Sequence, residues 1–321
     1  RIIFVKGYGA FVVGENFKSL NIAKDLLETT AETIYNAEKI GHFKSISRAD
    51  QFDIEYWSLE QAKLNSTKPK ALEGNIVVIT GGAGTIGLAT AIEFKELGAE
   101  VIILDNDIKG IERVRSKYNI IGYYCDLKNI KNIERVFNKI SEKYGGLDIL
   151  ISNAGMAEQG KIGTVDEKLF KDSFEINFWA HQRVSKYAIN IMSKQNMGGV
   201  LLFNVSKQAL NPGVNFGPYG IPKSATLSLM RQYAIDYASI KIRSNAINAD
   251  RIRSGLLTKN MIKERSKARG VNEKQYMSGN LLGLEVRAKD VAKAFVSLAL
   301  AERTTGVIMT VDGGNIAASP R

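Results

Sequence analysis

Residues 75–87 read NIVVITGGAGTIG, and this stretch decides the fold. Ile76–Ile79 is a short apolar run, typical of a parallel strand that is buried on both faces. Glycines follow at once, and Leu88–Leu97 then has the apolar spacing of a helix that Gly98 is placed to end. A glycine turn between strand and helix points free backbone N–H groups at the helix start. There a pyrophosphate gains hydrogen bonds and the favourable end of the helix dipole.

A second apolar strand, Glu100–Leu104, ends in Asp105. This carboxylate falls about 20 residues past the glycines, the distance at which it can accept hydrogen bonds from an adenosine ribose. A glycine cluster alone is often a plain turn. Strand, helix, second strand and acid in this order predict dinucleotide binding.

Strands and helices continue to alternate to the end of the chain. The expected strands are 120–124, 147–152, 200–205, 242–247 and 306–311. The expected helices are 109–117, 130–144, 217–238 and 288–300, with further helices within 166–197. Such alternation predicts an α/β fold with a doubly wound, Rossmann-type parallel sheet and right-handed crossovers.

The first 64 residues do not fit this pattern. Ile2–Val5 and Phe11–Val13 predict a hairpin, and Phe17–Ile40 predicts a long amphipathic helix. We expect residues 1–64 to be an α+β fragment, the end of a larger domain. Residues 65–73 are polar and are expected to be a linker. The nucleotide-binding domain is then 74–321.

Bulk composition excludes several classes of function. The chain has 44 basic and 33 acidic residues, a net charge of +11, but the basic residues are spread and no nucleic-acid motif is present, so we expect no nucleic-acid partner. No apolar run approaches the ~18 residues that cross a bilayer, so no membrane partner is expected. A single cysteine, Cys125, excludes an internal disulfide and a cysteine-based metal site, and favours the cytoplasm.

Polar side chains follow several of the predicted strands, where an open parallel sheet binds its ligands. They are Asp105, Asp126, Asn153 and Ser206. Tyr219 and Lys223, spaced i and i+4, lie on one face of a helix and can reach the same point. The same spacing in Tyr35 and Lys39 has no serine at a strand end before it, so we interpret that pair as an ordinary helix face.

From about residue 72 onward the chain resembles a short-chain dehydrogenase/reductase. The resemblance is carried by Thr80-Gly81-x-x-x-Thr85-Ile86-Gly87, Asp126-Leu127, Asn153-Ala154-Gly155, Asn177, Ser206, Tyr219-x-x-x-Lys223 and Val311-Asp312-Gly313-Gly314. The chain departs from the family at Thr85, where glycine is common, and at Ala249-Asp250, where the family usually has Pro-Gly.

The resemblance implies a catalytic role for four residues. Tyr219 would be the general acid/base, and Lys223 would lower the pKa of its phenol from the ordinary value of ~10. Ser206 would hydrogen-bond the substrate oxygen. Asn177 would anchor a water that links Lys223 to solvent.

The resemblance also implies a nicotinamide cofactor. Its binding residues would be Gly81, Gly84, Thr85, Ile86, Gly87, Asp105, Asp126, Leu127, Asn153, Ala154, Gly155, Tyr219, Lys223, Ile252 and Ser254. NAD is favoured over NADP, because Asp105 would repel a 2′-phosphate and neither Asn106 nor Thr85 supplies a cation to meet one.

A closer resemblance is to bifunctional proteins that join a class II aldolase for rhamnulose 1-phosphate to a dehydrogenase assigned to lactaldehyde. It is carried by FDIEYWSLEQAKL (52–64), NFGPYGIPK (215–223) and NADRIRSGLL (248–257). It implies that residues 1–64 are the end of the aldolase domain. It also implies a lactaldehyde-like substrate from deoxysugar breakdown, and a homodimer or homotetramer.

A class II aldolase needs several histidines for its metal, and the chain has only His42 and His181. We therefore expect no metal site and no aldolase activity. A catalytically silent NAD-binding or assembly module of an aldolase fusion is the alternative to an enzyme.

The loop Arg251–Lys274 is rich in basic residues and lies where the family places its substrate lid. One interpretation is a solvated helix face. The other is a positive cover for an anionic substrate, with Arg251 or Arg253 as its contact.

Overall fold

A computed structural model of the chain describes residues 2–57 and 68–315. The chain divides into two units, Arg1–Gly74 and Asn75–Arg321. Residues 58–67 lie outside the described residues. They include the end of the stretch 52–64 on which the aldolase resemblance rests and the first residues of the expected linker.

The N-terminal unit contains the expected hairpin and long helix. Strands β1 (Ile2–Val5) and β2 (Gly9–Val12) pair antiparallel, with Ile2 opposite Val12. Helix α1 (Phe17–Ile40) has the predicted bounds and begins in a capping box, and none of its residues is buried. A short helix that we did not expect, α2 (Arg48–Glu55), follows it, also with no buried residue.

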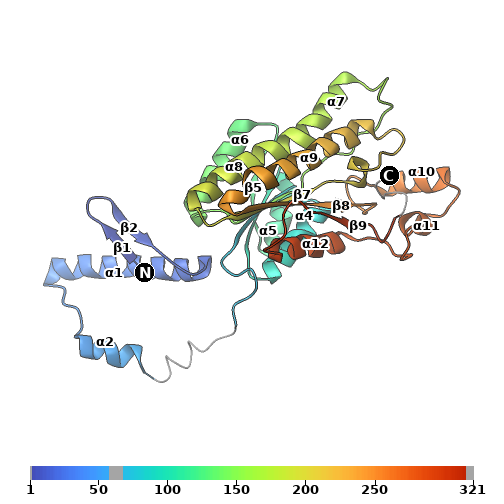
Figure 1. Cartoon of the computed structure of the whole chain (residues 1–321). Coiled ribbons are helices and arrows are strands. Elements are labelled where there is room, and N and C mark those ends of the chain that lie inside the picture. Colours follow the sequence, from blue (N-terminus) through green and yellow to red (C-terminus); the bar gives the residue numbers. More distant parts are fainter. Residues whose placement is uncertain (1, 58–67, 316–321) are drawn as a thin grey trace. The chain divides into compact units, whose positions relative to one another are not determined.

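The second unit is built on a seven-stranded sheet, and its neighbouring strands all pair in parallel (Figure 1). The strand order is β5-β4-β3-β6-β7-β8-β9. The bounds are β3 Ile76–Thr80, β4 Glu100–Asp105, β5 Ile121–Tyr124, β6 Ile149–Ser152, β7 Gly199–Asn204, β8 Ile242–Ala249 and β9 Ile308–Val311. The prediction of a doubly wound parallel sheet is confirmed.

Helices cover both faces of this sheet: α4, α5 and α12 lie on one face, and α6, α8 and α9 on the other (Figure 1). Their bounds are α4 Thr85–Glu96, α5 Ile108–Tyr118, α6 Ile130–Tyr144, α7 Glu167–Phe174, α8 Ala180–Gln195, α9 Gly217–Asp236 and α12 Ala288–Leu300. Because both faces are covered, every residue of β3 is buried, with Val77, Val78 and Ile79 at 0% exposure.

The helices expected within 166–197 are α7 and α8. Between α7 and α8 the chain forms one π-helical turn, η1 (Glu175–Trp179), and Asn177 lies buried in it. A π turn holds one residue more than an α turn and is frequent at functional sites.

Two further helices begin in the basic segment Arg251–Lys274, for which a solvated helix face was one of our two interpretations. They are α10 (Lys259–Ala268) and α11 (Glu273–Met277). Ile262, Tyr276 and Met277 pack with Leu257 into a small apolar cluster, which gives the segment a core of its own.

Candidate functional site

The glycine turn between β3 and α4 has no room for side chains at two positions. A Cβ on Gly87 would lie 2.2 Å from the carbonyl oxygen of Gly81, and a Cβ on Gly82 would lie 2.3 Å from the Cβ of Ile103. Gly81 itself has φ +63°, in the left-handed region. The α4 helix begins at Thr85 with Gly84 as N-cap, three residues earlier than predicted. The turn therefore brings its backbone N–H groups close to whatever binds there.

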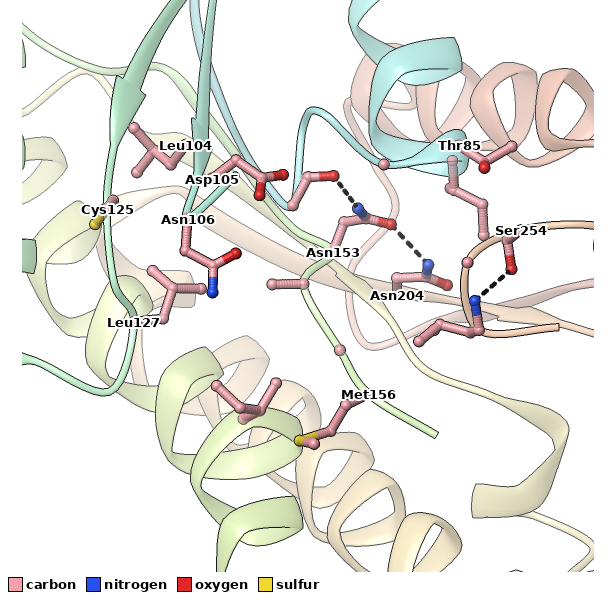
Figure 2. A pocket seen from close by; sticks show the side chains of 18 of the residues that line it. Thr85, Leu104, Asp105, Asn106, Cys125, Leu127, Asn153, Met156, Asn204 and Ser254 are labelled. Atoms are coloured by element: carbon pink, nitrogen blue, oxygen red, sulfur yellow. Dashed lines mark hydrogen bonds between the residues drawn. The ribbon is translucent and has the colours of Figure 1, made fainter. Parts of the chain in front are cut away.

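A pocket of about 480 Å³ lies beyond the carboxyl ends of the central strands (Figure 2). It contains most of the predicted cofactor residues. Those that line it are Gly81, Gly84, Thr85, Ile86, Asp105, Asp126, Leu127, Asn153, Ala154, Gly155 and Ser254, while Gly87, Tyr219, Lys223 and Ile252 do not. Leu104, Asn106, Cys125, Met156 and Asn204 also contribute to its wall.

The carboxylate of Asp105 is fixed at the edge of the pocket. Oδ2 accepts a hydrogen bond from the Ala83 backbone N–H (2.9 Å), and Oδ1 accepts one from that of Asp107 (3.0 Å). One cation near the turn escaped the sequence reasoning: Arg113 donates to the carbonyl oxygen of Ala83 (3.3 Å).

Asn153 holds the glycine turn to the next strands along the sheet. Its side-chain nitrogen donates to the carbonyl oxygens of Thr80 (3.0 Å) and Gly81 (3.3 Å). Its side-chain oxygen accepts from Asn204 Nδ2 (2.8 Å), as Figure 2 shows. Asn204 Oδ1 is buried and has no hydrogen-bond partner among the described residues. An unpaired acceptor at a pocket wall is a place for a hydroxyl or amide of a ligand.

None of the four residues expected to be catalytic is among those that line this pocket, but Lys223 and Asn177 contact residues that do. Ser206 follows β7 and is 8% exposed, and Lys223 on α9 is 2% exposed. The ammonium of Lys223 donates to the carbonyl oxygen of the pocket residue Asn204 (2.9 Å). Asn177 contacts the pocket residue Met156 twice, accepting from its backbone N–H (3.2 Å) and donating to its carbonyl oxygen (2.9 Å).

The phenol of Tyr219 differs from our expectation in one respect. Burial raises its pKa above the ordinary value, and a hydrogen bond with Ser206 opposes this rise only in part. We expected Lys223 to lower this pKa. Its Nζ lies 6.0 Å from the Tyr219 ring centroid, and burial lowers the pKa of Lys223 itself to about 7. A half-neutral amine at that distance does not outweigh desolvation of the phenolate.

His181 on α8 is a site residue that the sequence reasoning missed. It is 1% exposed; its Nδ1 lies 2.6 Å from Ser152 Oγ and its Nε2 lies 3.4 Å from Lys223 Nζ. Burial, followed by the nearby charge of Lys223, holds its pKa well below the ordinary value, so the imidazole is neutral.

The guanidinium groups of the two predicted substrate residues are engaged by the protein. Arg251 donates to Asp250 (3.0 Å), to the carbonyl oxygen of Tyr276 and to that of Gly279 (3.0 Å). Arg253 makes two hydrogen bonds to Glu285 (2.7 and 3.3 Å). Neither residue lines the pocket.

Asp250, which stands where the family usually has glycine, ties three segments together. Its carboxylate pairs with Lys207 (3.3 Å) and Arg251 (3.0 Å) and accepts a hydrogen bond from Asn315. These contacts hold the start of the basic segment Arg251–Lys274 next to Lys207, the residue that follows Ser206. The neighbouring Ser254 accepts from the backbone N–H groups of Leu256 and Leu257 (3.2 Å each).

Over residues 2–57 and 68–315, no three side chains of the histidine, cysteine, aspartate and glutamate types gather as a metal site would require. His42 is exposed and interacts with Glu38 in its own turn (3.5 Å). In the same described part of the chain, no helix combines the length and the apolar character needed to cross a membrane.

Known families match both parts of the chain. A family described as Enoyl-(Acyl carrier protein) reductase matches residues 81–315, and one described as Aldolase class II, second domain, matches residues 1–64. An uncharacterized oxidoreductase of Thermotoga maritima is 32% identical over 252 residues, covering 76% of this chain and 98% of that protein. The uncharacterized oxidoreductase YuxG of Bacillus subtilis is 28% identical over 337 residues. That match covers 100% of this chain and 49% of YuxG, so the chain spans about half the length of this relative.

Solved structures share the fold of the second unit. A 3-ketoacyl-(acyl-carrier-protein) reductase from Brucella melitensis, complexed with NADH, has a TM-score of 0.69 at 26% identity, over 76% of this chain and 99% of its own. Levodione reductase has a TM-score of 0.70 at 22% identity, over 77% of this chain and 99% of its own, a likeness of fold alone.

Proposed function

The chain belongs to the short-chain dehydrogenase/reductase family of oxidoreductases, and from this premise we propose that it transfers a hydride between NAD and a small hydroxyaldehyde or alcohol. The observation that carries the proposal is that buried Lys223 donates to the pocket residue Asn204, while the half-buried Tyr219 on the same helix is hydrogen-bonded to buried Ser206. When bound, the nicotinamide would accept or supply the hydride.

The residues present fit such a cofactor. The absence of a side chain on Gly87 lets the turn fold tightly against the start of α4, because a Cβ there would meet the Gly81 carbonyl oxygen at 2.2 Å, and a pyrophosphate would bind at this helix start. Asn204, another residue of the pocket wall, has a buried side-chain oxygen without a hydrogen-bond partner among the described residues. Lys223, bonded to the carbonyl oxygen of the same asparagine, is placed to donate to a ribose hydroxyl.

The acid–base work falls to Tyr219. Because burial raises its pKa, the phenol is protonated near neutral pH and can donate to the oxygen of a carbonyl substrate. Ser206, already hydrogen-bonded to this phenol, is placed to hold that oxygen. In the opposite direction Tyr219 must accept a proton, and the positive charge of Lys223 on the same helix stabilises the phenolate that does so.

We propose NAD rather than NADP because of Asp105. Its carboxylate lies at the edge of the pocket with Asn106 beside it, and a 2′-phosphate there would meet a negative charge. The Brucella melitensis reductase, a structural neighbour solved in complex with NADH, is consistent with this choice.

The substrate proposal rests on residues 1–64. A match to the second domain of class II aldolases, on the same chain as the dehydrogenase, suits an enzyme that oxidises or reduces an aldolase product. We therefore propose a lactaldehyde-like substrate from deoxysugar breakdown. We also propose that the protein works in the cytoplasm as a homodimer or homotetramer, which sedimentation of the purified protein tests.

The test separates an enzyme from a silent module. NADH absorbance is followed with both cofactors and with lactaldehyde, propanediol and a panel of related alcohols, and NADH binding is measured separately by fluorescence. We expect turnover that Tyr219→Phe lowers by about 10²–10⁴-fold, the range for loss of a general acid.

Tyr35→Phe is the matched control, because Tyr35 has the same i, i+4 lysine but lies on an exposed helix, with Lys39 Nζ 4.0 Å from its ring centroid. NADH binding without turnover on any substrate would favour the silent module. Absence of NADH binding would refute the cofactor site itself.

A further inference from the structure

One buried titratable group has no part in the chemistry described so far. His181 is 1% exposed on α8, and its ring lies between Ser152 at the end of β6 and Lys223 on α9. The ring of Phe203 on β7 lies 6.2 Å away, centroid to centroid. The Ala154 backbone also hydrogen-bonds the ring, which raises the pKa of His181 but less than burial and the charge of Lys223 lower it. A histidine enclosed by a hydroxyl, an ammonium, a backbone group and an aromatic ring has few protonation states open to it.

Within residues 2–57 and 68–315, Lys223 has two acceptors, and both are uncharged. They are the carbonyl oxygen of Asn204 (2.9 Å) and the imidazole Nε2 of His181 (3.4 Å). Among the described residues no carboxylate contributes to the pKa of Lys223, which burial alone lowers. The hydrogen bonds that offset the cost of burying the Lys223 ammonium must therefore come from uncharged acceptors.

The hydrogen bonds of Asn177 are made to groups other than the Lys223 ammonium. Its side-chain nitrogen donates to Met156 and to Ser173 Oγ (3.0 Å), and its side-chain oxygen accepts from Met156. Its backbone carbonyl accepts a hydrogen bond from Thr226 Oγ1. One helical turn further along, His181 contacts Lys223 instead.

We propose that His181 is a positioning residue for Lys223: as a neutral imidazole it accepts a hydrogen bond from the ammonium through Nε2, while Ser152 at Nδ1 fixes which nitrogen carries the proton. With Lys223 charged, Nδ1–H donates to Ser152 Oγ and Nε2 is free to accept. With Lys223 neutral, the Ser152 hydroxyl can donate to Nδ1 while Nε2–H faces the lone pair of the amine. The tautomer of His181 therefore follows the charge of Lys223, and the imidazole stays neutral in both arrangements.

The other ionisable groups around the pair do not account for this coupling. Burial raises the pKa of Tyr219 and of Tyr233, the latter stacked on Phe203, so both phenols are neutral near pH 7. On α8 itself, Arg183 is paired with Glu175 (2.7 Å). Among the described residues, Lys223 is thus the group whose charge changes next to His181.

The test uses the small number of histidines. The chain has two, so His42→Gln leaves His181 as the single histidine of the full-length protein, and ¹⁵N-labelled histidine then gives one imidazole spectrum. We expect the ¹⁵N shifts of a neutral ring with the proton on Nδ1 below about pH 7, the pKa of Lys223, and a movement toward the Nε2–H form above it. In Lys223→Met the movement should disappear.

A ring that protonates to imidazolium as the pH falls toward its ordinary pKa, or one whose tautomer changes equally in Lys223→Met, would overturn the proposal. Ser152→Ala supplies a second check, since loss of the Nδ1 partner should shift the tautomer toward Nε2–H at low pH. An unchanged tautomer in this variant contradicts the assigned role of Ser152.

The consequence for turnover rests on the proposed function, and it is measured separately. His181→Leu should lower kcat about ten- to a hundredfold, the range for a lost hydrogen bond to a charged group, and move the pH profile, with KM for the cofactor little changed. His181→Gln, whose amide oxygen can accept in place of Nε2, should restore part of the rate. Equal losses in both variants would indicate packing alone. If the wild-type protein turns over no substrate, the proposed function fails, and the imidazole spectrum still decides the contact.

Discussion

Replacing Lys223 by methionine should make the protein more stable at neutral pH. Burial lowers the pKa of Lys223 from 10.5 to about 7, so the folded protein holds a proton there less tightly than the unfolded chain does. At about 1.4 kcal/mol for each pH unit, this difference destabilises the folded state by roughly 5 kcal/mol at pH values below 7. Methionine fills nearly the same volume with no charge, and loses about 1 kcal/mol for the hydrogen bond to Asn204.

The sign depends on pH in a defined window. Below about pH 7 both states bind the proton and the full penalty applies, so Lys223→Met should gain a few kcal/mol. Between 7 and 10.5 only the unfolded state binds the proton, and the advantage should shrink by about 1.4 kcal/mol per pH unit. Above 10.5 neither state does, and the variant should be the less stable of the two.

Urea denaturation followed by far-UV circular dichroism, at several pH values across this window, measures the difference between wild type and variant. The matched control is Lys39→Met, an exposed lysine four residues after a tyrosine, which should change little at any pH. A wild-type-minus-variant difference that does not change with pH would refute the reasoning, because it would mean that Lys223 keeps an ordinary pKa in the folded protein.

Three further substitutions test other parts of the site. Gly87→Ala should abolish NADH binding by fluorescence while leaving the fold seen by circular dichroism intact, because the new Cβ meets the Gly81 carbonyl at 2.2 Å; binding at wild-type strength would contradict the tight turn. Asp105→Asn should lower the preference for NAD over NADP about tenfold, the effect of removing one unfavourable charge worth about 1.4 kcal/mol, and an unchanged ratio of kcat/KM values would assign the selectivity elsewhere. Arg251→Ala should cost about 3 kcal/mol in thermal or urea unfolding, because it removes one of the two cations paired with the buried Asp250 and the donor to two carbonyl groups. A tenfold rise in the substrate KM with unchanged stability would instead support the substrate contact predicted from the sequence.

The sheet and its helices could be predicted because local patterns determine them. Strand β3 is buried on both faces, and its sequence Ile76–Ile79 is an unbroken apolar run. Helices α6 and α12 have the predicted bounds. The bounds of helices α10 and α11 were not predicted, because their segment is dominated by charge and was interpreted only as a helix face or a cover. Their start signals were nevertheless present: Thr258 caps the first, and Asn272 with Gln275 forms a capping box at the second.

The same difference between local pattern and long-range packing decides which residues of the candidate site could be predicted. Tyr219 and Lys223 could be paired from the sequence because they are one helical turn apart. His181 could not be placed, since its partners Ser152 and Lys223 lie 29 and 42 residues away. The raised pKa of Tyr219 depends on burial, a property of the whole packed domain that neither spacing nor residue type reports.

The π-helical turn at Glu175–Trp179 fixes the number of residues that must lie between α7 and His181. Deleting any one residue from it would restore an uninterrupted α-helix and rotate everything downstream by about 100° about the helix axis. His181 would then swing away from Lys223 although its own codon was untouched. Surface loops tolerate insertions and deletions at little cost in free energy. At this turn, an inserted or deleted residue would misplace the site residues that follow it.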